Sequence, residues 1–290
     1  MEARQNIPER FDAAALDWDD RVTLTLQGLY RSCGFERYRM SRFEPFDLYF
    51  DNRGFLRDAN VITFTGPGGK LMALKPDVTL SLVKNLPADV ACQKLFYVEN
   101  VFRIQASSGE FSEIAQVGVE YIGCPPELSA ADCATPVDLE VLQLALESMR
   151  VIGPNARLVL SHMGLSVQAR DLLAGQLLCA VPLDEALAAL RALPASIVAP
   201  EVLASLQTIW DGFAAAGQAD CLCFDLSLVG DTEYYTGITF QGYVEGLPRA
   251  VLSGGRYDGL MERFDKPQGA CGFAVYLGEI SSAFMGGRQA

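Results

Sequence analysis

Hydrophobic residues recur at helical spacing in several parts of the chain. In the first of these, Val22, Leu26 and Leu29 share one face, as expected of an amphipathic helix. Asp77 is placed to cap a second helix and Thr135 a third. The segments expected to contain helix are residues 19–33, 77–86, 135–149, the proline-interrupted block 165–217, the end of a glycine-rich turn at 253–264, and the end of 269–284.

Extended segments separate these helices. Residues 35–51 are predicted to be extended, with Pro45 marking an edge strand or a bulge. Two β-rich runs within residues 57–79 flank a glycine-rich turn, which predicts a hairpin. Tyr234 and Tyr235 begin another strand, so they are expected to point to opposite faces of a sheet. The remaining predicted strands are residues 94–104, 113–123, 157–163, 221–229, 234–244 and 249–253.

The order of these elements indicates the fold class. Helix and strands come first, a helical block follows, and strands with a helix return at the end. This order is typical of an α+β fold with a largely antiparallel sheet, because alternating β-α-β units are absent from the pattern. We therefore expect a single domain over residues 1–290, with residues 165–217 as a helical insertion within it.

The composition narrows the classes of function. Half of the 290 residues are hydrophobic, but no run of about 18 apolar residues occurs, so no membrane span is expected. The N-terminus lacks the apolar core of a signal peptide, which predicts a cytoplasmic protein. The net charge of −13 disfavours nucleic-acid binding. Eight scattered cysteines and one histidine predict reduced thiols, no metal site and no cofactor.

Six motifs, in this order, resemble the catalytic core of histidyl-tRNA synthetases and their paralogues over about residues 10–285. They read LKPDVTLSLVKN, KLFYVENVFR, AQVGVEYIG, LVGDTEYYTGITF, GGRYDGL and GFAVYLGEI. The resemblance implies a class II aminoacyl-tRNA synthetase-like antiparallel sheet of six to seven strands, flanked by helices. Residues 42–51 correspond to the dimer-interface motif, so a homodimer is implied. The anticodon-binding domain of the synthetases is expected to be absent.

The sequence departs from the synthetases where they grip ATP. An arginine that supports amino-acid activation in the family is Gly230 here. The loop of the second class II motif, Gly-Arg-Tyr-Arg in the synthetases, has Glu110 at its first arginine and Ser112 at its second. A further arginine, on the helix of the third motif, is replaced by Glu279. Adenylation develops charge on a phosphoryl group and needs positioned cations, so these changes together argue against catalysis.

The amino-acid pocket of the family is retained in the sequence. By the resemblance, Glu120 and Tyr235 would contact an imidazole ring, and Arg103 would hold a carboxylate. Three residues would meet an amino group, and two tyrosines would complete the wall. The full set of expected histidine-binding residues is Asp77, Thr79, Arg103, Gln116, Glu120, Tyr234, Tyr235 and Tyr257.

Simpler interpretations of the same residues stay open at this point. Glu120 is also compatible with a solvent-exposed carboxylate on a strand. Arg103 is also compatible with a structural ion pair to Glu99. The tyrosines could be ordinary core or interface aromatics, and His162 is expected to have no catalytic role.

A retained pocket beside missing cations resembles the regulatory subunits of the short form of ATP phosphoribosyltransferase. These are histidyl-synthetase paralogues that assemble with a separate catalytic subunit and mediate histidine feedback on the first step of histidine biosynthesis. Asp77 after Pro76 favours this group slightly, because the synthetases usually have Glu there. The alternatives are an amino-acid-activating ligase, such as a truncated histidyl-tRNA synthetase-like enzyme, and a paralogue that binds another small molecule or a protein.

Overall fold

The computed structural model describes residues 16–56, 61–87, 92–105, 108–129, 133–177, 179–228, 234–278 and 280. Two of the positions that separate the sequence from the synthetases, Gly230 and Glu279, therefore lie outside the described residues. In the part of the chain that is described, no helix is long and apolar enough to cross a membrane.

A mixed sheet forms the centre of the molecule, with the strand order β1-β5-β6-β12-β11-β10-β7-β9-β8. Neighbouring strands are antiparallel except at β1–β5 and β7–β9. The α+β class is thus confirmed, although the described part of this sheet has nine strands rather than six to seven, because short edge strands extend it. The strands are β1 (Glu36–Arg37), β5 (Cys92–Ile104), β6 (Phe111–Gly123), β7 (Ala156–His162), β8 (Val181–Pro182), β9 (Leu222–Phe224), β10 (Ile238–Val244), β11 (Leu252–Arg256) and β12 (Ala270–Tyr276).

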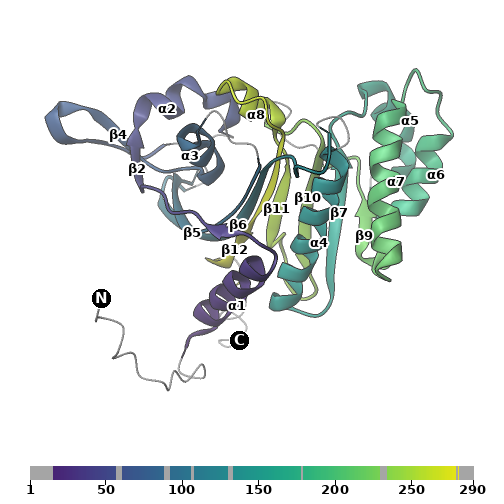
Figure 1. Ribbon diagram of the computed structural model, residues 1–290, viewed down its shortest axis with the longest axis horizontal. Helices are drawn as coiled ribbons and strands as arrows, with labels where there is room; N and C mark the ends of the chain where they lie inside the picture. The colour runs from purple at the N-terminus through teal and green to yellow at the C-terminus, as the bar shows by residue number, and fades with distance from the viewer. Residues whose placement is uncertain are drawn as a thin grey trace.

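A second, three-stranded sheet forms an arm that projects from one end of the molecule (Figure 1). Its order is β2 (Phe43–Pro45), β4 (Leu71–Leu74), β3 (Thr63–Thr65). The antiparallel pairing of β3 with β4 confirms the predicted hairpin. A short 3-10 turn at Pro67–Gly69 joins the two strands, and Gly68 and Gly69 both have positive φ there.

The prediction that residues 35–51 are extended throughout is wrong at its end. Residues Phe46–Asp51 form the short helix α2. Pro45, which has no N–H to continue a strand ladder, is the N-cap residue of this helix. The helix then buries Leu48 and Tyr49. Adjacent apolar residues such as these do not show helical spacing, so the pattern alone did not reveal it.

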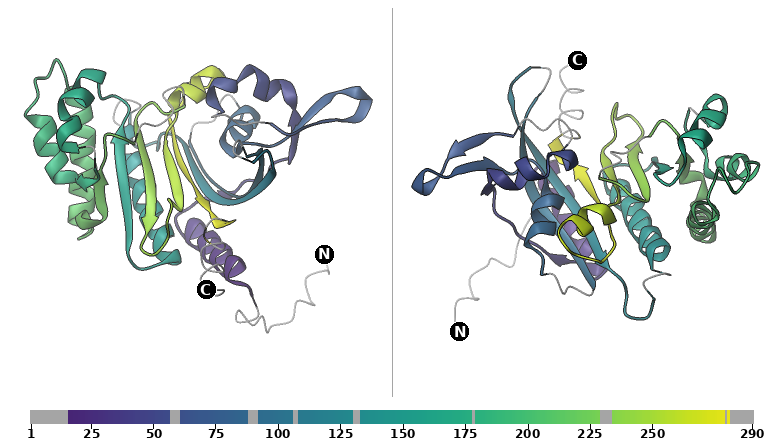
Figure 2. Two further views of the ribbon diagram at one scale, coloured as in Figure 1. Left: turned by 180° about the vertical axis from the view of Figure 1, so that it is seen from behind. Right: turned by 90° about the horizontal axis from the view of Figure 1, so that it is seen from above.

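Helices cover the two faces of the sheet unequally. Helices α1 (Trp18–Ser32) and α4 (Ala134–Ile152) share a large hydrophobic core with one face of the sheet. A second, smaller core joins α2, α3 (Val78–Asn85) and α8 (Asp258–Arg263) near the other face. Figure 1 and Figure 2 show α2, α3 and α8 gathered beside the concave part of the sheet. The remaining short 3-10 segments are Arg53–Phe55 and Ala219–Cys221.

The start of α4 differs from the expectation at Thr135. The helix begins at Ala134, and Cys133 occupies the N-cap position. Thr135 and Pro136 lie inside the first turn, where a missing backbone N–H costs no intrahelical bond. A proline in that turn is therefore compatible with a start one or two residues earlier.

Residues 165–217 contain three helices and lie between strands β7 and β9 in the chain. The helices are α5 (Val167–Leu177), α6 (Leu183–Arg191) and α7 (Pro200–Ala215), and they gather at the end of the molecule opposite the arm (Figure 2). Strands β7 and β9, which precede and follow this block, run parallel side by side. The block is thus the crossover connection between them. That it is an insertion into a single domain stays a prediction.

Candidate functional site

A cavity of about 370 Å³ opens over the face of the sheet opposite α1 and α4. Its size is within the usual range for sites that bind small molecules. All eight residues that the sequence nominated line this one cavity, although they come from segments up to 180 residues apart. They are Asp77, Thr79, Arg103, Gln116, Glu120, Tyr234, Tyr235 and Tyr257. The contacts that each of them would make with histidine remain predictions.

Strand β6 supplies the centre of the site because its residues alternate between two faces. Val117, Val119 and Tyr121 belong to the hydrophobic core. Gln116 and Glu120 point the other way and line the cavity. Because successive side chains of a strand point to opposite faces of the sheet, β6 contributes residues both to the core and to the cavity.

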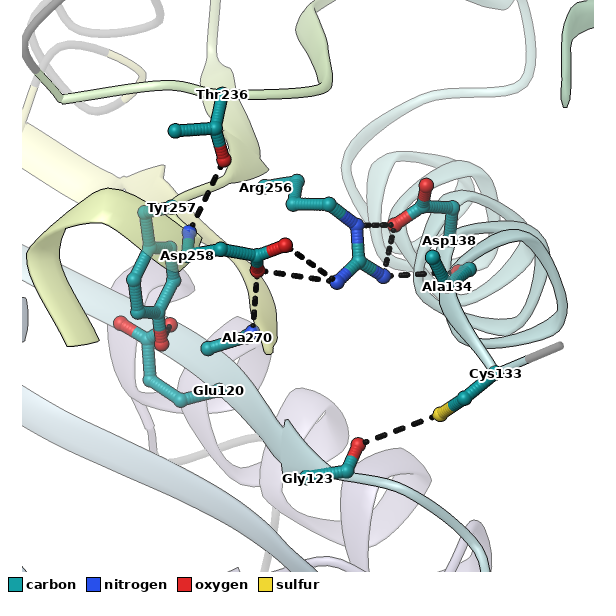
Figure 3. A network of polar contacts seen from close by, with 10 residues as sticks. All are labelled: Glu120, Gly123, Cys133, Ala134, Asp138, Thr236, Arg256, Tyr257, Asp258 and Ala270. Atoms are coloured by element: carbon teal, nitrogen blue, oxygen red, sulfur yellow. Dashed lines mark hydrogen bonds and ion pairs between the residues drawn. The ribbon is translucent and has the colours of Figure 1, made fainter. Parts of the chain in front are cut away.

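Glu120 is the most deeply buried acidic residue of the cavity, with 1% of its surface exposed. The hydroxyl of Thr79 donates to its Oε1 at 2.6 Å, and the hydroxyl of Tyr257 donates to its Oε2 at 2.6 Å. Figure 3 shows Tyr257 above this carboxyl. The interpretation of Glu120 as a solvent-exposed carboxylate is therefore wrong.

Burial is the largest effect on the acidity of Glu120 and raises its pKa from 4.5 to about 8. The hydrogen bonds from Thr79 and Tyr257 act in the opposite direction, and the nearby carboxyl of Asp77 raises the pKa further. In the described part of the chain, this carboxyl accepts hydrogen bonds from neutral hydroxyls rather than from a cation, so the group favours its neutral form near neutral pH.

Glycines make the room that Glu120 and the aromatic rings occupy. Glu120, Gly272 and Gly255 are direct neighbours in one row across β6, β12 and β11. A Cβ on Gly272 would overlap the carboxyl of Glu120, and one on Gly255 would press into the ring of Tyr235. A Cβ on Gly118 would overlap the hydroxyl end of Tyr97. Gly255 lies within β11, so the prediction of a glycine-rich turn from residue 253 is wrong there.

The opposite wall is built by the start of helix α3. Asp77 is its N-cap, as predicted, and its carboxylate accepts the N–H of Leu80 at 2.7 Å. Burial raises the pKa of Asp77, while that hydrogen bond and the charge of Arg103 lower it. A capped helix N-terminus beside the cavity fixes the position of this acidic group.

Arg103 comes from β5, and its side chain is held by the backbone just before α3. Its Nε donates to the carbonyl oxygen of Pro76 at 2.9 Å. Glu99, the structural partner considered for it, instead pairs with the buried Lys75 at 2.9 Å. Within the described residues, Arg103 is the single basic side chain that lines the cavity.

Tyr234 and Tyr235 differ from the expectation in their arrangement. Both precede β10, which begins at Ile238, so the alternation of a strand does not apply to them. Both rings line the cavity, with their centroids 4.9 Å apart in an edge-to-face pair. Tyr234 also contacts Tyr257 and Phe55. The adjacent tyrosines therefore form one aromatic wall rather than facing opposite sides.

Several lining residues were not nominated from the sequence. Tyr97 lies on β5 six residues before Arg103, and the alternation of that strand could have indicated it. Several others carry neutral polar or small side chains, which the sequence did not distinguish from ordinary strand residues. They include Thr239, Gln241, Ser253, Ala274 and Tyr276.

The hairpin of β5 and β6 has no basic side chain at the described positions that match the nucleotide-gripping loop of the synthetases. Glu110 is the turn residue that donates its N–H toward Ser108, and Phe111 begins β6 with 75% of its surface exposed. Ser112 pairs with Arg103 in the strand register. The described tip is thus acidic and apolar.

The single histidine and the cysteines form no reactive or metal-binding arrangement in the part of the chain that the structure covers. His162 accepts the N–H of Gly164 through Nδ1 at 3.0 Å, and burial lowers its pKa to about 4. All eight cysteines are free thiols. The described residues contain no group of three or more His, Cys, Asp or Glu that could hold a metal ion.

The mainly antiparallel sheet, with a cavity on one face and long helices on the other, is the fold of a class II aminoacyl-tRNA synthetase core. A model of the histidyl-tRNA synthetase family matches residues 17–174 and 168–280. The chain therefore belongs to the histidyl-tRNA synthetase family.

Solved structures agree with this fold. The structure of an ATP phosphoribosyltransferase regulatory subunit/histidyl-tRNA synthetase from Bacillus halodurans is similar with a TM-score of 0.72 and 22% identity, covering 97% of this chain and 83% of that one. Apo histidyl-tRNA synthetase from S. aureus is similar with a TM-score of 0.67 and 21% identity, covering 97% of this chain and 73% of that one.

Curated relatives share one name. The ATP phosphoribosyltransferase regulatory subunit of Moorella thermoacetica is 28% identical over 95% of this chain and 81% of its own length. The protein of the same name from Caldanaerobacter subterraneus is 28% identical over 89% of this chain and 76% of its own length. The similarity to regulatory subunits thus extends along nearly the whole chain.

The raised pKa of Glu120 predicts a pH dependence of stability. Below pH 4.5 the carboxyl is protonated in both states, but between pH 4.5 and about 8 only the folded state keeps the proton. The free energy of unfolding therefore falls as pH rises through this window. Glu120→Gln removes this loss, so its stability relative to the wild type should rise from pH 5 to pH 8, by at most about 1.4 kcal/mol per pH unit.

Urea unfolding at pH 5, 6, 7 and 8 measures this difference. Glu113→Gln is the matched control, because Glu113 is an exposed carboxylate on the same strand. Parallel pH profiles for the wild type and Glu120→Gln would contradict a raised pKa at this position.

Proposed function

We propose that this chain is a non-catalytic regulatory subunit of ATP phosphoribosyltransferase. It would bind histidine in the cavity beside Glu120 and act with a separate catalytic subunit in the first step of histidine biosynthesis and its feedback control. The names of the curated relatives support this role. The observation that carries it is that all eight residues nominated by the resemblance line one cavity, with Arg103 as the single basic side chain among the described lining residues.

The charges of the cavity match those of histidine. Asp77 and Glu120 offer two carboxyl groups, and Arg103 offers one guanidinium. Histidine carries an ammonium group, a carboxylate, and an imidazole that takes up a proton near pH 6.5. A ligand with these groups would supply a positive partner for the buried Glu120, whose hydrogen bonds from the described residues come from neutral hydroxyls. The tyrosine wall suits a flat ring, because aromatic groups pack edge-to-face or offset-stacked.

The same cavity is poorly suited to a triphosphate. Arg103 is its one basic residue in the described part, and Asp77 and Glu120 place carboxyl groups there rather than further cations. The sequence also has Glu110, Gly230 and Glu279 where the resemblance places arginines. Each charge-assisted contact to phosphate is worth about 1.5–3 kcal/mol, so losing several would slow adenylation by orders of magnitude. These features favour a regulatory role over the alternative of an amino-acid-activating ligase.

Histidine binding is the first expected result. Isothermal titration calorimetry at pH 7.5 should detect histidine binding to the wild type with one site per chain. Glu120→Gln should weaken it at least about tenfold, the effect of one lost charge-assisted hydrogen bond. Glu113→Gln, on the same strand but outside the cavity, should leave the affinity unchanged. A wild type that does not respond to histidine would remove the centre of the proposal.

A two-part activity assay separates the regulatory role from the ligase. The purified chain alone should show no histidine-dependent exchange of pyrophosphate into ATP, because the lining residues that are described offer one cation to the phosphates. Mixed with a short catalytic ATP phosphoribosyltransferase subunit, it should change the rate of phosphoribosyl transfer, and histidine should lower that rate. Exchange that persists through successive purification steps would favour the ligase.

A homodimer is also proposed, and the arm supports it. Exposed apolar side chains gather on β2, β3, β4 and α2, where Phe43 and Phe64 pack edge-to-face at 5.7 Å. Such clusters mark interaction surfaces more often than free surface. The wild type should sediment as a dimer at micromolar concentration, and Phe43→Asp with Phe64→Asp should shift it toward the monomer. A monomeric wild type would contradict this.

A further inference from the structure

Arg256 is a buried arginine at the end of β11 that points away from the cavity. Its Nε and Nη2 donate to one carboxylate oxygen of Asp138 at 2.9 and 2.7 Å. Nη2 also donates to the carbonyl of Ala134 at 2.8 Å, and Nη1 donates to Asp258 at 3.1 Å. Figure 3 shows the guanidinium enclosed between these groups. Only 6% of the residue is exposed, and it does not line the cavity.

Neighbouring residues confine the side chain of Arg256 to one position. A Cβ on Gly237 would come within 2.9 Å of its Cδ, and one on Gly269 within 2.8 Å of its Nη1. Cys271, its neighbour in the sheet register, is fully buried and hydrogen-bonds to Asp138. A guanidinium fixed on all sides by charged and backbone acceptors is a rigid element of the structure.

This rigid element adjoins every tyrosine that the sequence nominated. Tyr257 is the next residue in the chain, and its hydroxyl donates to Glu120. The carbonyl of Arg256 accepts the N–H of Thr236, directly after Tyr234 and Tyr235. The N–H of Asp258 donates to the hydroxyl of Thr236 at 3.1 Å, which closes the link between the two segments (Figure 3).

The other end of the cluster is on helix α4. Asp138 and Ala134 belong to its first two turns. The same helix packs against α1, α7 and strands β7, β10 and β12. Arg256 is therefore the charged connection between the wall of the cavity and the helix that lies on the opposite face of the sheet.

We propose that Arg256, held by Asp138 and Asp258, is a positioning residue that fixes Tyr257 against Glu120 and thereby links ligand occupancy to helix α4. The inference deepens the proposed function and rests on histidine as the ligand of this cavity. It assigns Arg256 no contact with the ligand or with phosphate. Its effect on binding is transmitted through the hydroxyl of Tyr257.

Asp138→Asn tests this connection, because it removes the charge that orients Arg256 and keeps the shape of the side chain. Titration calorimetry should show about tenfold weaker histidine binding than in the wild type, as expected for groups in one network. In a Tyr257→Phe background, Asp138→Asn should weaken binding less than twofold further. An effect on folding alone would add equally in both backgrounds, so the double-mutant cycle separates the two.

Glu140→Gln is the matched control. Glu140 lies on the same helix two residues further on and pairs with Lys94 at 2.6 Å, but neither residue lines the cavity. This variant should bind histidine as the wild type does. Equal losses for Asp138→Asn and Glu140→Gln, or additive losses in the cycle, would overturn the inference while leaving histidine binding by the wild type intact.

Two further measurements test the inference if Asp138→Asn does not fold or if the wild type does not bind histidine. If Asp138→Asn does not fold, Asp258→Asn, whose side chain is 34% exposed, removes the other carboxylate and should produce the same pattern. If the wild type does not bind histidine, the proposed function fails, and near-ultraviolet circular dichroism of the ligand-free protein decides the positioning role. Asp138→Asn should then lose the spectral component that Tyr257→Phe loses, and Glu140→Gln should keep it.

Discussion

The structure depends on one constraint, the burial of the Glu120 carboxyl on the face of a sheet. A buried carboxyl without a cationic partner is costly, and a shift toward the neutral form is the usual response. Here two hydroxyls donate to it, and Gly272 beside it has no side chain to compete for the space. Because these partners are Thr79 of α3 and Tyr257, the residue directly after β11, this one group brings distant segments to the same point.

The strand register makes that burial possible and explains why the site and the core do not interfere. On β6, the side chains of Val117 and Val119 belong to the core with α1 and α4, while Glu120 faces the cavity. A slip of one residue would exchange the two faces and place the carboxyl in the hydrophobic core. The long antiparallel pairing with β5, from Cys92–Gly123 to Ile104–Phe111, fixes the register against such a slip.

The sequence predicted those parts of the molecule in which local pattern and tertiary structure agree. The alternation on β6 and the cap at Asp77 were predicted correctly, because period and capping chemistry are local. The helix after Pro45 and the shared orientation of Tyr234 and Tyr235 were not. In these cases a short segment takes its shape from the surfaces that it packs against, and neither surface is adjacent in the sequence.

The cluster around Arg256 could not be predicted for a related reason. Asp138 lies 118 residues before Arg256, and an aspartate in the first turns of a helix is ordinarily read as favourable to the helix dipole. Only the folded chain shows that this carboxylate reaches an arginine at the end of a strand.

The distribution of buried cations supports the division between structure and recognition. Lys75 pairs with Glu99, Arg256 pairs with Asp138 and Asp258, and Lys266 donates to the carbonyl of Val83. Each of these charges is already satisfied by the protein, so moving it to a phosphate would leave a buried acceptor without its donor. Among the described residues that line the cavity, only Arg103 adds positive charge. Because the buried cations hold segments of the fold together, the described part of the cavity is left with one cation, and the proposal of a zwitterionic ligand rather than a nucleotide rests on this arrangement.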